Sequence, residues 1–589
     1  MIQNNQIGLL ADRPGPGDVA AAWVGRLQAA LDRGPAAAFE DLFIEQAAWR
    51  DLVLMSWTTS STSPRAEVVR ALRERLANVS PVRVTIAGTP DWVTRVGREC
   101  LEIFLAFTTR HGRGRGIVRL VESDGAYRGW TLSTALEEII GHEERRGANR
   151  RRGGHYEHVA PGANWRDMRE WAVAYRDREP DVLVVGGGQA GLGVAARLNH
   201  LEVDTLVVDK WPRIGDNWRQ RYHMLALHNE TWTCHLPYLE FPDSFPTFLP
   251  KDQLANWFEI YVEAMEINYW AGTELVSGAY HVQDGRWTVT LRQGGGAQRV
   301  VRPRHIVMAT GVSGIPYRPD IPGLSDFTGD VRHTTEFVNG APYAGQSVVV
   351  VGTGNSAHDV AQELHRWGAD VTMLQRGSTT VIGLEPAGRL PSRIYHEGRS
   401  LDDVDLLAVS TPPPYALRSQ QLLTDRMREL DRDLIRQLND KGFRTDYAED
   451  GGGMLSKYLR RGGGYYINVG ACDLIISGEV GLRQWSDVEG FSPRAIRFRD
   501  GTAPHVDAII LATGYQPMGA AVERYFGAEV AGRVGQIWGL DETGEVANVW
   551  KRTPQPGLWF AAGSLASCRQ RSRYLALEIK ADLLGLSRS

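Results

Sequence analysis

The sequence predicts an α/β protein with two dinucleotide-binding domains of the Rossmann type, preceded by a smaller α+β domain. A short apolar run followed by closely spaced glycines stands at residues 181–191 ("DVLVVGGGQAG") and again at residues 347–357 ("SVVVVGTGNSA"). An apolar strand that leads through such a turn into a helix is typical of the Rossmann fold. Before residue 140, helix-like segments come first and strand-like segments follow. Segregated helices and strands favour an α+β arrangement.

The first glycine turn has the features of an FAD site. Gly186 permits a tight turn, Gly188 lets a pyrophosphate approach the backbone, and Gly191 lets helix and strand pack closely. The free N–H groups at the start of the helix, including those of Gln189 and Ala190, would then face the phosphates. The next strand ends in Asp209, whose carboxylate can accept hydrogen bonds from a ribose.

The second glycine turn differs at the end of its second strand. Gly352 and Gly354 repeat the spacing, and Asn355 and Ser356 open the following helix. The strand then ends in Gln375 and Arg376, where the first site has an acid. An arginine there can pair with a ribose 2′-phosphate, so this site suits NADPH, and NADH stays an open alternative.

These sites divide the chain. The expected segments are an N-terminal domain at 15–140, a linker at 141–178, the first part of an FAD-binding domain at 179–335, an NADPH-binding domain at 336–510 with a helical insertion at 385–465, and the C-terminal part of the FAD-binding domain at 511–589. Tyr465 and Tyr466 in the insertion either line a substrate pocket or pack in a core, and the core is favoured.

Three helices and four strands are expected in the N-terminal domain. The helices are expected at 18–31, 36–49 and 63–76, the last with Ser63 as its cap, and the strands at 82–88, 100–110, 116–123 and 127–134. This order resembles the cone-shaped fold of nuclear transport factor two. We expect the domain to cover the rest of the protein or to form a dimer. Asp51 and His111 could serve a second active site, but capping or surface roles are favoured.

The linker is rich in arginine and glycine and ends in an amphipathic segment at 165–175. Its arginine cluster could bind an anion, although a solvated face is the favoured interpretation. The cluster consists of Arg145, Arg146, Arg150, Arg151 and Arg152.

Composition excludes several classes of protein. The net charge of −4 provides no basic field, which speaks against a nucleic-acid partner. The N-terminus has no secretory leader and no run of about 18 apolar residues occurs, so we expect a cytoplasmic protein without membrane association. The four cysteines lie far apart and form no CxxC motif, which argues against a disulfide framework, a metal centre and a dithiol redox centre.

Residues 178–585 resemble the flavin-containing monooxygenases, a family of class B flavoprotein monooxygenases. Five motifs occur in that family's order: the first glycine turn, "GDNW" at 215–218, "FTGDVRHTTEF" at 327–337, "GTGNSA" at 352–357, and "ATGY" at 512–515. The resemblance implies that Asn217, Trp218, Gly514 and Tyr515 also contact cofactors. A long domain before the first glycine turn is similar to the type II subgroup, and other segments resemble the auxin-forming branch.

The motif at 327–337 matches the family signature F-x-G-x-x-x-H followed by an aromatic residue. The related Baeyer–Villiger signature ends in Trp followed by Pro or Asp, whereas this chain has Phe337 and Val338. A typical type I Baeyer–Villiger enzyme is therefore not expected. We expect the motif to cross from the FAD domain to the NADPH domain, with Phe327 and Phe337 anchoring its two ends and Gly329 letting the chain turn.

The resemblance implies a monooxygenase that forms a flavin (hydro)peroxide with FAD and NADPH. One oxygen atom of dioxygen then enters a small ketone, amine, sulfide or indole-like substrate. Asn229 and His333 are the catalytic candidates; a turn-forming role for Asn229 and a domain-linking hydrogen bond for His333 remain open. A homodimer is expected. The alternatives are a flavin-dependent NAD(P)H oxidase or reductase without oxygen transfer, and a non-catalytic flavin-binding interaction module.

Overall fold

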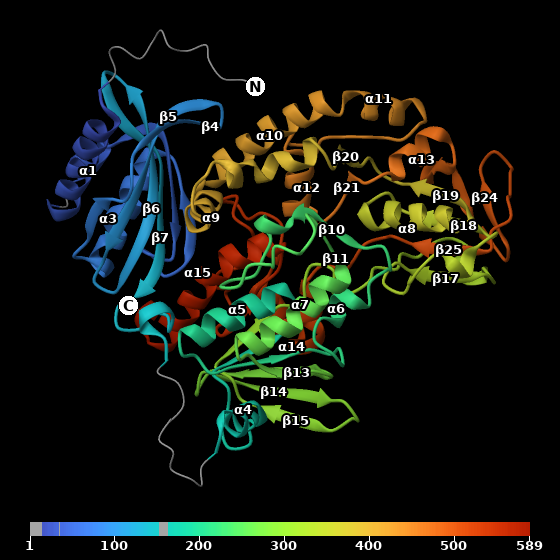
Figure 1. Cartoon of the computed structure of the whole chain (residues 1–589), viewed down its shortest axis with the longest axis horizontal. Coiled ribbons are helices and arrows are strands. Elements are labelled where there is room, and N and C mark those ends of the chain that lie inside the picture. Colours follow the sequence, from blue (N-terminus) through green and yellow to red (C-terminus); the bar gives the residue numbers. More distant parts are fainter. Residues whose placement is uncertain (1–13, 34–35, 152–162, 589) are drawn as a thin grey trace. The chain divides into compact units, whose positions relative to one another are not determined.

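The computed structural model describes residues 14–33, 36–151 and 163–588 (Figure 1). The chain forms two compact units. Unit 1 contains Met1–Glu144, Ser400–Ser419 and Leu577–Ser589, and unit 2 contains Arg145–Arg399 and Gln420–Ala576. Among the described residues, no helix has the length and apolar character needed to cross a membrane.

Unit 1 combines helices with one seven-stranded sheet. The sheet has the order β2-β1-β7-β6-β5-β3, with β4 paired to β5, and only the β1–β7 pairing is parallel. Its likeness to the cone-shaped fold stays a prediction. The elements are α1 (Pro16–Arg33), α2 (Ala36–Glu40), β1 (Phe43–Leu52), β2 (Thr59–Thr62), α3 (Arg65–Val79), β3 (Arg83–Ile86), β4 (Asp91–Arg95), β5 (Arg98–Thr108), β6 (Gly112–Ser123) and β7 (Ala126–Ile139).

The prediction of a helix at 36–49 is wrong over most of this range. Helix α2 ends at Glu40, and strand β1 already begins at Phe43. The apolar spacing was compatible with a helix, but pairing of β1 with both β2 and β7 overrides it, because the pairing buries nearly every residue of the strand. Ser63 is not the cap of α3 either, since Pro64 occupies that position and no side chain caps the helix.

A segment distant in sequence completes unit 1. Helix α9 (Leu401–Ser410) and the start of α10 (Pro413–Leu430) lie within the expected insertion, yet residues 400–419 belong to unit 1. Buried Arg50 on β1 donates from Nη1 to the carbonyl oxygen of Val409 at 2.7 Å. The ring of Tyr415 packs edge-on against Trp130, with 4.8 Å between centroids. These contacts explain why α9 stays with this sheet.

Unit 2 contains a first parallel sheet of five strands in the order β12-β9-β8-β16-β26. The central strands are buried at every position, as expected for a parallel sheet covered on both faces. The strands are β8 (Val182–Val185), β9 (Thr205–Val208), β12 (Asn268–Trp270), β16 (His305–Met308) and β26 (Leu558–Phe560), and helix α5 (Gln189–His200) follows β8. An antiparallel sheet of β13 (Thr273–His281), β14 (Arg286–Gln293) and β15 (Gln298–Val301) adjoins it in sequence.

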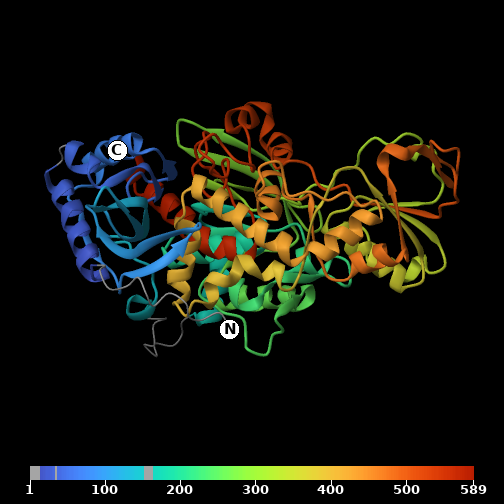
Figure 2. The same ribbon diagram turned by 90° about the horizontal axis from the view of Figure 1, so that it is seen from above.

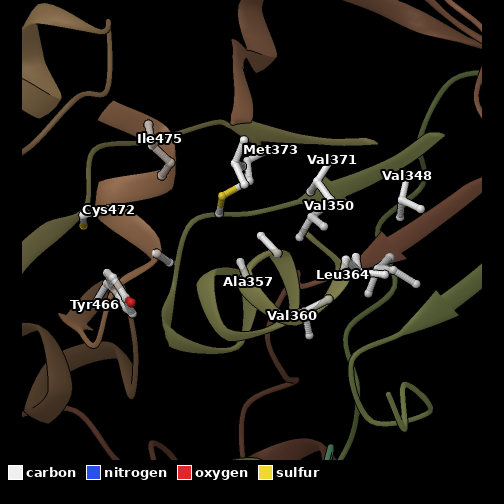
Figure 3. Packing of buried hydrophobic residues seen from close by; sticks show 14 of the residues in the cluster. Val348, Val350, Ala357, Val360, Leu364, Val371, Met373, Tyr466, Cys472 and Ile475 are labelled. Carbon is white, nitrogen blue, oxygen red and sulfur yellow. The ribbon is translucent and has the colours of Figure 1, made fainter. Parts of the chain in front are cut away.

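A second parallel sheet in unit 2 has the order β17-β25-β18-β19-β22. Figure 3 shows the face of this sheet on which helix α8 packs, with valines of β18 and β19 against Ala357, Val360 and Leu364. This sheet and α8 stand at the right of Figure 2. The elements are β17 (Asp330–His333), β18 (Ser347–Val351), α8 (Asn355–Arg366), β19 (Asp370–Gln375), β22 (Val480–Gln484) and β25 (Ala508–Leu511). The predicted pair of Rossmann-like domains is confirmed.

The remaining helices and strands come before, between and after the strands of the two parallel sheets along the chain. Residues 385–465 contain η5, α9, α10, α11 and α12, and their assignment as an insertion of the NADPH-binding domain stays a prediction. The bounds are α4 (Trp165–Ala174), α6 (Asp216–Arg219), β10 (Ala226–Glu230), β11 (Phe248–Pro250), α7 (Lys251–Ala264), β20 (Thr380–Gly383), the 3₁₀ helix η5 (Ala387–His396), α11 (Arg432–Asp440), α12 (Gly453–Arg461), β21 (Tyr465–Asn468), α13 (Ala471–Ser477), β23 (Val488–Ser492), β24 (Ala495–Phe498), α14 (Gly519–Val534) and α15 (Leu565–Leu583).

The linker arginines contact protein groups. Arg145 pairs with Glu202 at 3.0 Å, and Arg151 donates to the carbonyl oxygen of Asn199 at 3.3 Å. Arg152 lies outside the described residues. Surface pairing of this kind is typical of a solvated face.

Candidate functional site

The first glycine turn brings bare backbone against a neighbouring strand end. Gly186 has φ +110°, and a Cβ on it would lie 2.5 Å from the carbonyl oxygen of Ala309. A Cβ on Gly191 would lie 1.9 Å from the oxygen of Gly186. Helix α5 then begins at Gln189 with Gly188 as an N-cap that offers no side chain. The N–H groups of this first turn, Ala190 included, therefore suit a pyrophosphate, and the turn fits FAD.

Asp209 closes this site at the end of β9. Its Oδ2 accepts from the N–H of Gly187 at 2.6 Å, and its Oδ1 accepts from the N–H of Trp211 at 3.0 Å. Burial raises the pKa of the Asp209 carboxyl, against these two hydrogen bonds, which lower it. Each oxygen keeps a further lone pair, so the ionised group can also accept from ribose hydroxyls.

Three predicted contact residues meet beside the turn. The indole N–H of Trp218 donates to Oε1 of Gln189 at 3.2 Å, and Nε2 of Gln189 donates to the carbonyl oxygen of Gly563 at 3.1 Å. A Cβ on Gly188 would lie 2.9 Å from Nδ2 of Asn217. Gln189 thus ties the glycine turn to α6 and to the chain after β26. The spacing of the glycine motif could not predict the contact with Gly563, because only the fold brings Gly563 close to Gln189.

The second glycine turn repeats this geometry. Gly352 has φ +127°, and a Cβ on it would lie 2.5 Å from the carbonyl oxygen of Ala512. Gly354 has open space around it, since a Cβ there would meet nothing nearer than an oxygen of Tyr465 at 4.0 Å. Asn355 begins α8 and accepts at Oδ1 from the N–H of Ile467 at 3.0 Å. The half-buried Ser356 follows it. The open side of Gly354 fits the close approach of a second dinucleotide.

The two residues at the end of β19 have different environments. Gln375 is fully buried and hydrogen-bonds to Arg444 and Gln484. Arg376 is exposed directly after the strand. Of these two residues, Arg376 is therefore the one that can reach a ribose 2′-phosphate, through its guanidinium.

His333 is fully buried, and both of its ring nitrogens have partners. Nε2 donates to the carbonyl oxygen of Gly514 at 3.0 Å, and Nδ1 accepts from the N–H of Thr335 at 3.2 Å. The ring lies edge-on to Tyr515 at 5.5 Å. Burial lowers the pKa of His333, so the neutral ring is favoured. These contacts position Gly514 and Tyr515; a role in proton transfer stays a prediction.

The motif at 327–337 is anchored at both ends within the second domain. Phe327 belongs to the core cluster that contains Val349 and Ile509, whereas Phe337 belongs to the cluster that contains Val348. Since successive residues of β18 point to opposite faces of its sheet, the two phenylalanines lie on opposite faces. The motif therefore wraps the edge strand β17 of the second sheet, whereas it was expected to cross from the FAD domain to the NADPH domain.

Gly329 is required for close packing at this edge. A Cβ on it would lie 2.2 Å from the carbonyl oxygen of Asp507 and 2.6 Å from the ring of Phe327. The φ angle of Gly329 is not positive. Glycine is therefore required at this position by the close packing and not by the turn that was expected.

The other candidates have the following surroundings. Asn229 is exposed on β10, and its catalytic role stays a prediction. The adjacent Glu230, which the sequence analysis missed, is buried and accepts from Ser392 at 2.9 Å. Tyr466 is buried and stacks on His358 at 3.8 Å, which confirms the core interpretation for this residue. The hydroxyl of Tyr515 is buried and has no hydrogen-bond partner among the described residues.

Cysteine redox chemistry and metal binding find no support in the described part of the chain. All four cysteines are free and buried, and burial raises the pKa of Cys100 to about 11. The described residues hold no group of histidines, cysteines and acids able to bind a metal. In unit 1, Asp51 is fully buried and accepts from Met55, Ser56 and Thr134, so it holds a turn.

Two glycine turns on two parallel sheets are typical of proteins that bind two dinucleotides, and sequence relatives narrow the class. Residues 183–392 match a family model described as pyridine nucleotide-disulphide oxidoreductase. The indole-3-pyruvate monooxygenase YUCCA1 of Oryza sativa subsp. japonica is 31% identical over 338 residues, covering 57% of this chain and 77% of that protein. The probable indole-3-pyruvate monooxygenase YUCCA3 of Arabidopsis thaliana is 30% identical over 57% of this chain and 72% of its own length.

Among solved structures, a flavin-containing monooxygenase from Stenotrophomonas maltophilia has 19% identity and a TM-score of 0.46, covering 69% of this chain and 99% of its own. The open form of cyclohexanone monooxygenase has 16% identity and a TM-score of 0.49, covering 70% of this chain and 88% of its own. The assignment therefore rests on the sequence relatives. This chain belongs to the flavin-containing monooxygenase family of class B flavoprotein monooxygenases. It is a monooxygenase that uses FAD and NADPH and inserts oxygen into a small molecule.

Replacement of Gly329 by alanine should destabilise the second domain. The new methyl group would meet the backbone oxygen of Asp507, which cannot move aside as a side chain could. We expect the free energy of unfolding to fall by about 2–3 kcal/mol, measured by chemical denaturation. Gly377→Ala, where nothing lies within 4 Å of the new Cβ, is the matched control. An unchanged stability for Gly329→Ala would contradict the packing argument.

Asp446 should contribute a pH-dependent part of the stability. Burial alone would raise its pKa, but hydrogen bonds from Lys457 and Ser378 outweigh that effect and lower the pKa from 3.8 to about 2. The contribution is complete above the unfolded pKa and is lost as the pH falls toward the folded one. We expect a loss of about 2 kcal/mol between pH 4 and pH 2.

The measurement is the free energy of unfolding against pH for the wild type and for Asp446→Asn. The variant should be less stable at neutral pH, because it leaves the buried Lys457 without its ion pair, and it should lose less stability in acid. Asp440→Asn removes an exposed carboxylate as a control. An identical acid dependence in Asp446→Asn and the wild type would rule out the assignment.

Proposed function

We propose that this monooxygenase oxygenates a small carbonyl compound, with an aromatic 2-keto acid as the first candidate. The observation that carries the proposal is the 31% identity to an indole-3-pyruvate monooxygenase over 77% of that protein's length. Other ketones, amines and sulfides are the competing substrate classes. The terminal Phe337 and Val338 of the motif at 327–337 depart from the typical type I Baeyer–Villiger signature, so they speak against that class of enzyme without choosing among the substrates.

In the proposed arrangement, the first turn holds FAD and the second holds NADPH. The N–H groups at the start of α5 bind the FAD pyrophosphate, and the Asp209 carboxylate accepts from its ribose. The open side of Gly354 receives the pyrophosphate of NADPH, and Arg376 pairs with its 2′-phosphate. The FAD held at the first turn would supply the redox chemistry, carrying electrons from NADPH to dioxygen so that one oxygen atom enters the substrate and the other leaves as water.

The chain's own residues position these groups. The hydrogen bond from His333 to the carbonyl oxygen of Gly514 fixes the turn that carries Tyr515. We propose that the buried Tyr515 hydroxyl, which lacks a protein partner in the described chain, donates to the nicotinamide cofactor or to the substrate. Trp218 and Gln189 brace the flavin side through their mutual hydrogen bond. Asn229 is proposed to face the two cofactors.

We also propose a cytoplasmic homodimer. Four free buried thiols fit a reducing compartment, and the N-terminal domain is the proposed assembly element. Light scattering coupled to size-exclusion chromatography measures the mass directly. A mass equal to one chain at micromolar concentration would exclude the dimer.

The activity test combines the FAD-loaded protein with NADPH, ¹⁸O₂ and a panel of keto acids, ketones, amines and sulfides. We expect one ¹⁸O atom in the product of an aromatic keto acid, detected by mass spectrometry, with NADPH consumption matched to product. Full release of hydrogen peroxide without oxygenated product from any compound would instead indicate an NADPH oxidase.

Gly354→Ala should weaken NADPH binding without disturbing the fold. The new methyl group has room in the protein, since its nearest contact is at 4.0 Å, but it occupies the side toward which the dinucleotide must approach. We expect the dissociation constant for NADP⁺ to rise about tenfold or more, with an unchanged melting temperature. Gly519→Ala, also without a neighbour within 4 Å, is the control. Unchanged NADP⁺ affinity in Gly354→Ala would remove the second turn as the NADPH site.

A further inference from the structure

The helical insertion returns to the end of β19, and its segment around Arg444 runs beside the residues that follow this strand. Thr379 and Thr445 form a parallel bridge between the two segments. The N–H of Thr379 donates to the carbonyl oxygen of Arg444 at 3.1 Å, and the N–H of Asp446 donates to the carbonyl oxygen of Thr379 at 3.4 Å. The segment around Arg444 thus extends the edge where the second Rossmann strand ends.

Gln375 fixes the main chain of Arg444 from both sides. Its Nε2 donates to the carbonyl oxygen of Arg444 at 2.9 Å, and its Oε1 accepts from the N–H of Arg444 at 2.8 Å. Gln375 is fully buried, so this two-point attachment is shielded from water. Oε1 of Gln375 also accepts from Nε2 of Gln484, and its two bonds to the main chain of Arg444 hold that segment at a defined position.

The side chain of Arg444 then lies beside Arg376. Nη2 of Arg444 donates to the carbonyl oxygen of Arg376 at 2.7 Å, and both arginines are exposed. A hydrogen bond of 2.7 Å between the hydroxyls of Thr353 and Thr379 ties this edge to the second glycine turn. Two guanidinium groups therefore stand at the carboxyl end of β19, where the adenosine ribose of a dinucleotide lies in this fold.

The carboxylate of Asp446, the nearest one in this segment, would not repel a bound anion. Asp446 pairs with Lys457 at 2.6 Å and accepts from Thr380 at 2.8 Å, and Ser378 donates to it as well. Its charge is compensated by a lysine that is itself buried. The two exposed arginines are left to attract a dianionic group.

We propose that Arg444 is a second specificity-determining residue, which binds the ribose 2′-phosphate together with Arg376. The Rossmann domain supplies Arg376, and the insertion supplies Arg444. This inference rests on the proposed function, because it takes the second turn as the NADPH site. It assigns to the insertion a part in distinguishing NADPH from NADH, which is a role in binding and not in the chemical step.

The test measures the dissociation constants of NADP⁺ and NAD⁺ by isothermal titration calorimetry on FAD-loaded wild type, Arg444→Gln and Arg376→Gln. We expect each variant to bind NADP⁺ about tenfold more weakly and NAD⁺ unchanged, because a charge-assisted contact to the phosphate is lost. The salt dependence of NADP⁺ affinity should also become shallower. Arg436→Gln, which removes an exposed arginine of α11 paired with Asp433, is the matched control.

Folding and binding effects can be told apart. The Gln375 bonds go to the main chain of Arg444, so Arg444→Gln should keep the wild-type melting temperature. An equal loss for NADP⁺ and NAD⁺ would show that Arg444 supports the dinucleotide site as a whole without contacting the 2′-phosphate and would overturn the proposal, as would an unchanged NADP⁺ affinity. A wild type that binds NADP⁺ no better than NAD⁺ would instead overturn the proposed NADPH preference itself.

Discussion

The close approach of a glycine to the end of a neighbouring strand is the constraint on which both proposed nucleotide sites depend. In the first domain Gly186 lies against the carbonyl of Ala309, and in the second Gly352 lies against the carbonyl of Ala512. Both alanines begin an "ATG" sequence at the end of a buried parallel strand. Any side chain at either glycine would separate the turn from its sheet, and the helix that follows would no longer aim its N–H groups at a pyrophosphate.

This pairing explains why the "ATG" segments recur with the glycine turns. The second one continues into Gly514 and Tyr515, and His333 holds it from the edge strand β17. The long motif at 327–337 thus has a structural task in the second domain: its aromatic ends enter the cores on both faces of the sheet, and its histidine fixes the strand end beside the site. The substrate is not encoded there.

Buried polar side chains attach the irregular segments to these sheets. Gln375 holds the main chain of Arg444, and Asp446 with Lys457 holds the loop after β19. In unit 1, Arg50 holds α9 through the carbonyl of Val409 in the same manner. Each of these groups would be costly to bury alone, so their pairing makes the position of each segment specific.

The glycine spacing, the apolar strands and the "ATG" ends were sufficient to predict both Rossmann-like domains, because these features depend on residues close together in sequence. Local periodicity failed at 43–49, where pairing of β1 with β7, more than 80 residues away, decides the conformation. For the same reason the sequence could not show that residues 400–419 join unit 1, or that Arg444 meets Arg376. Contacts across such separations carry no periodic signal, so only the tertiary structure decides them.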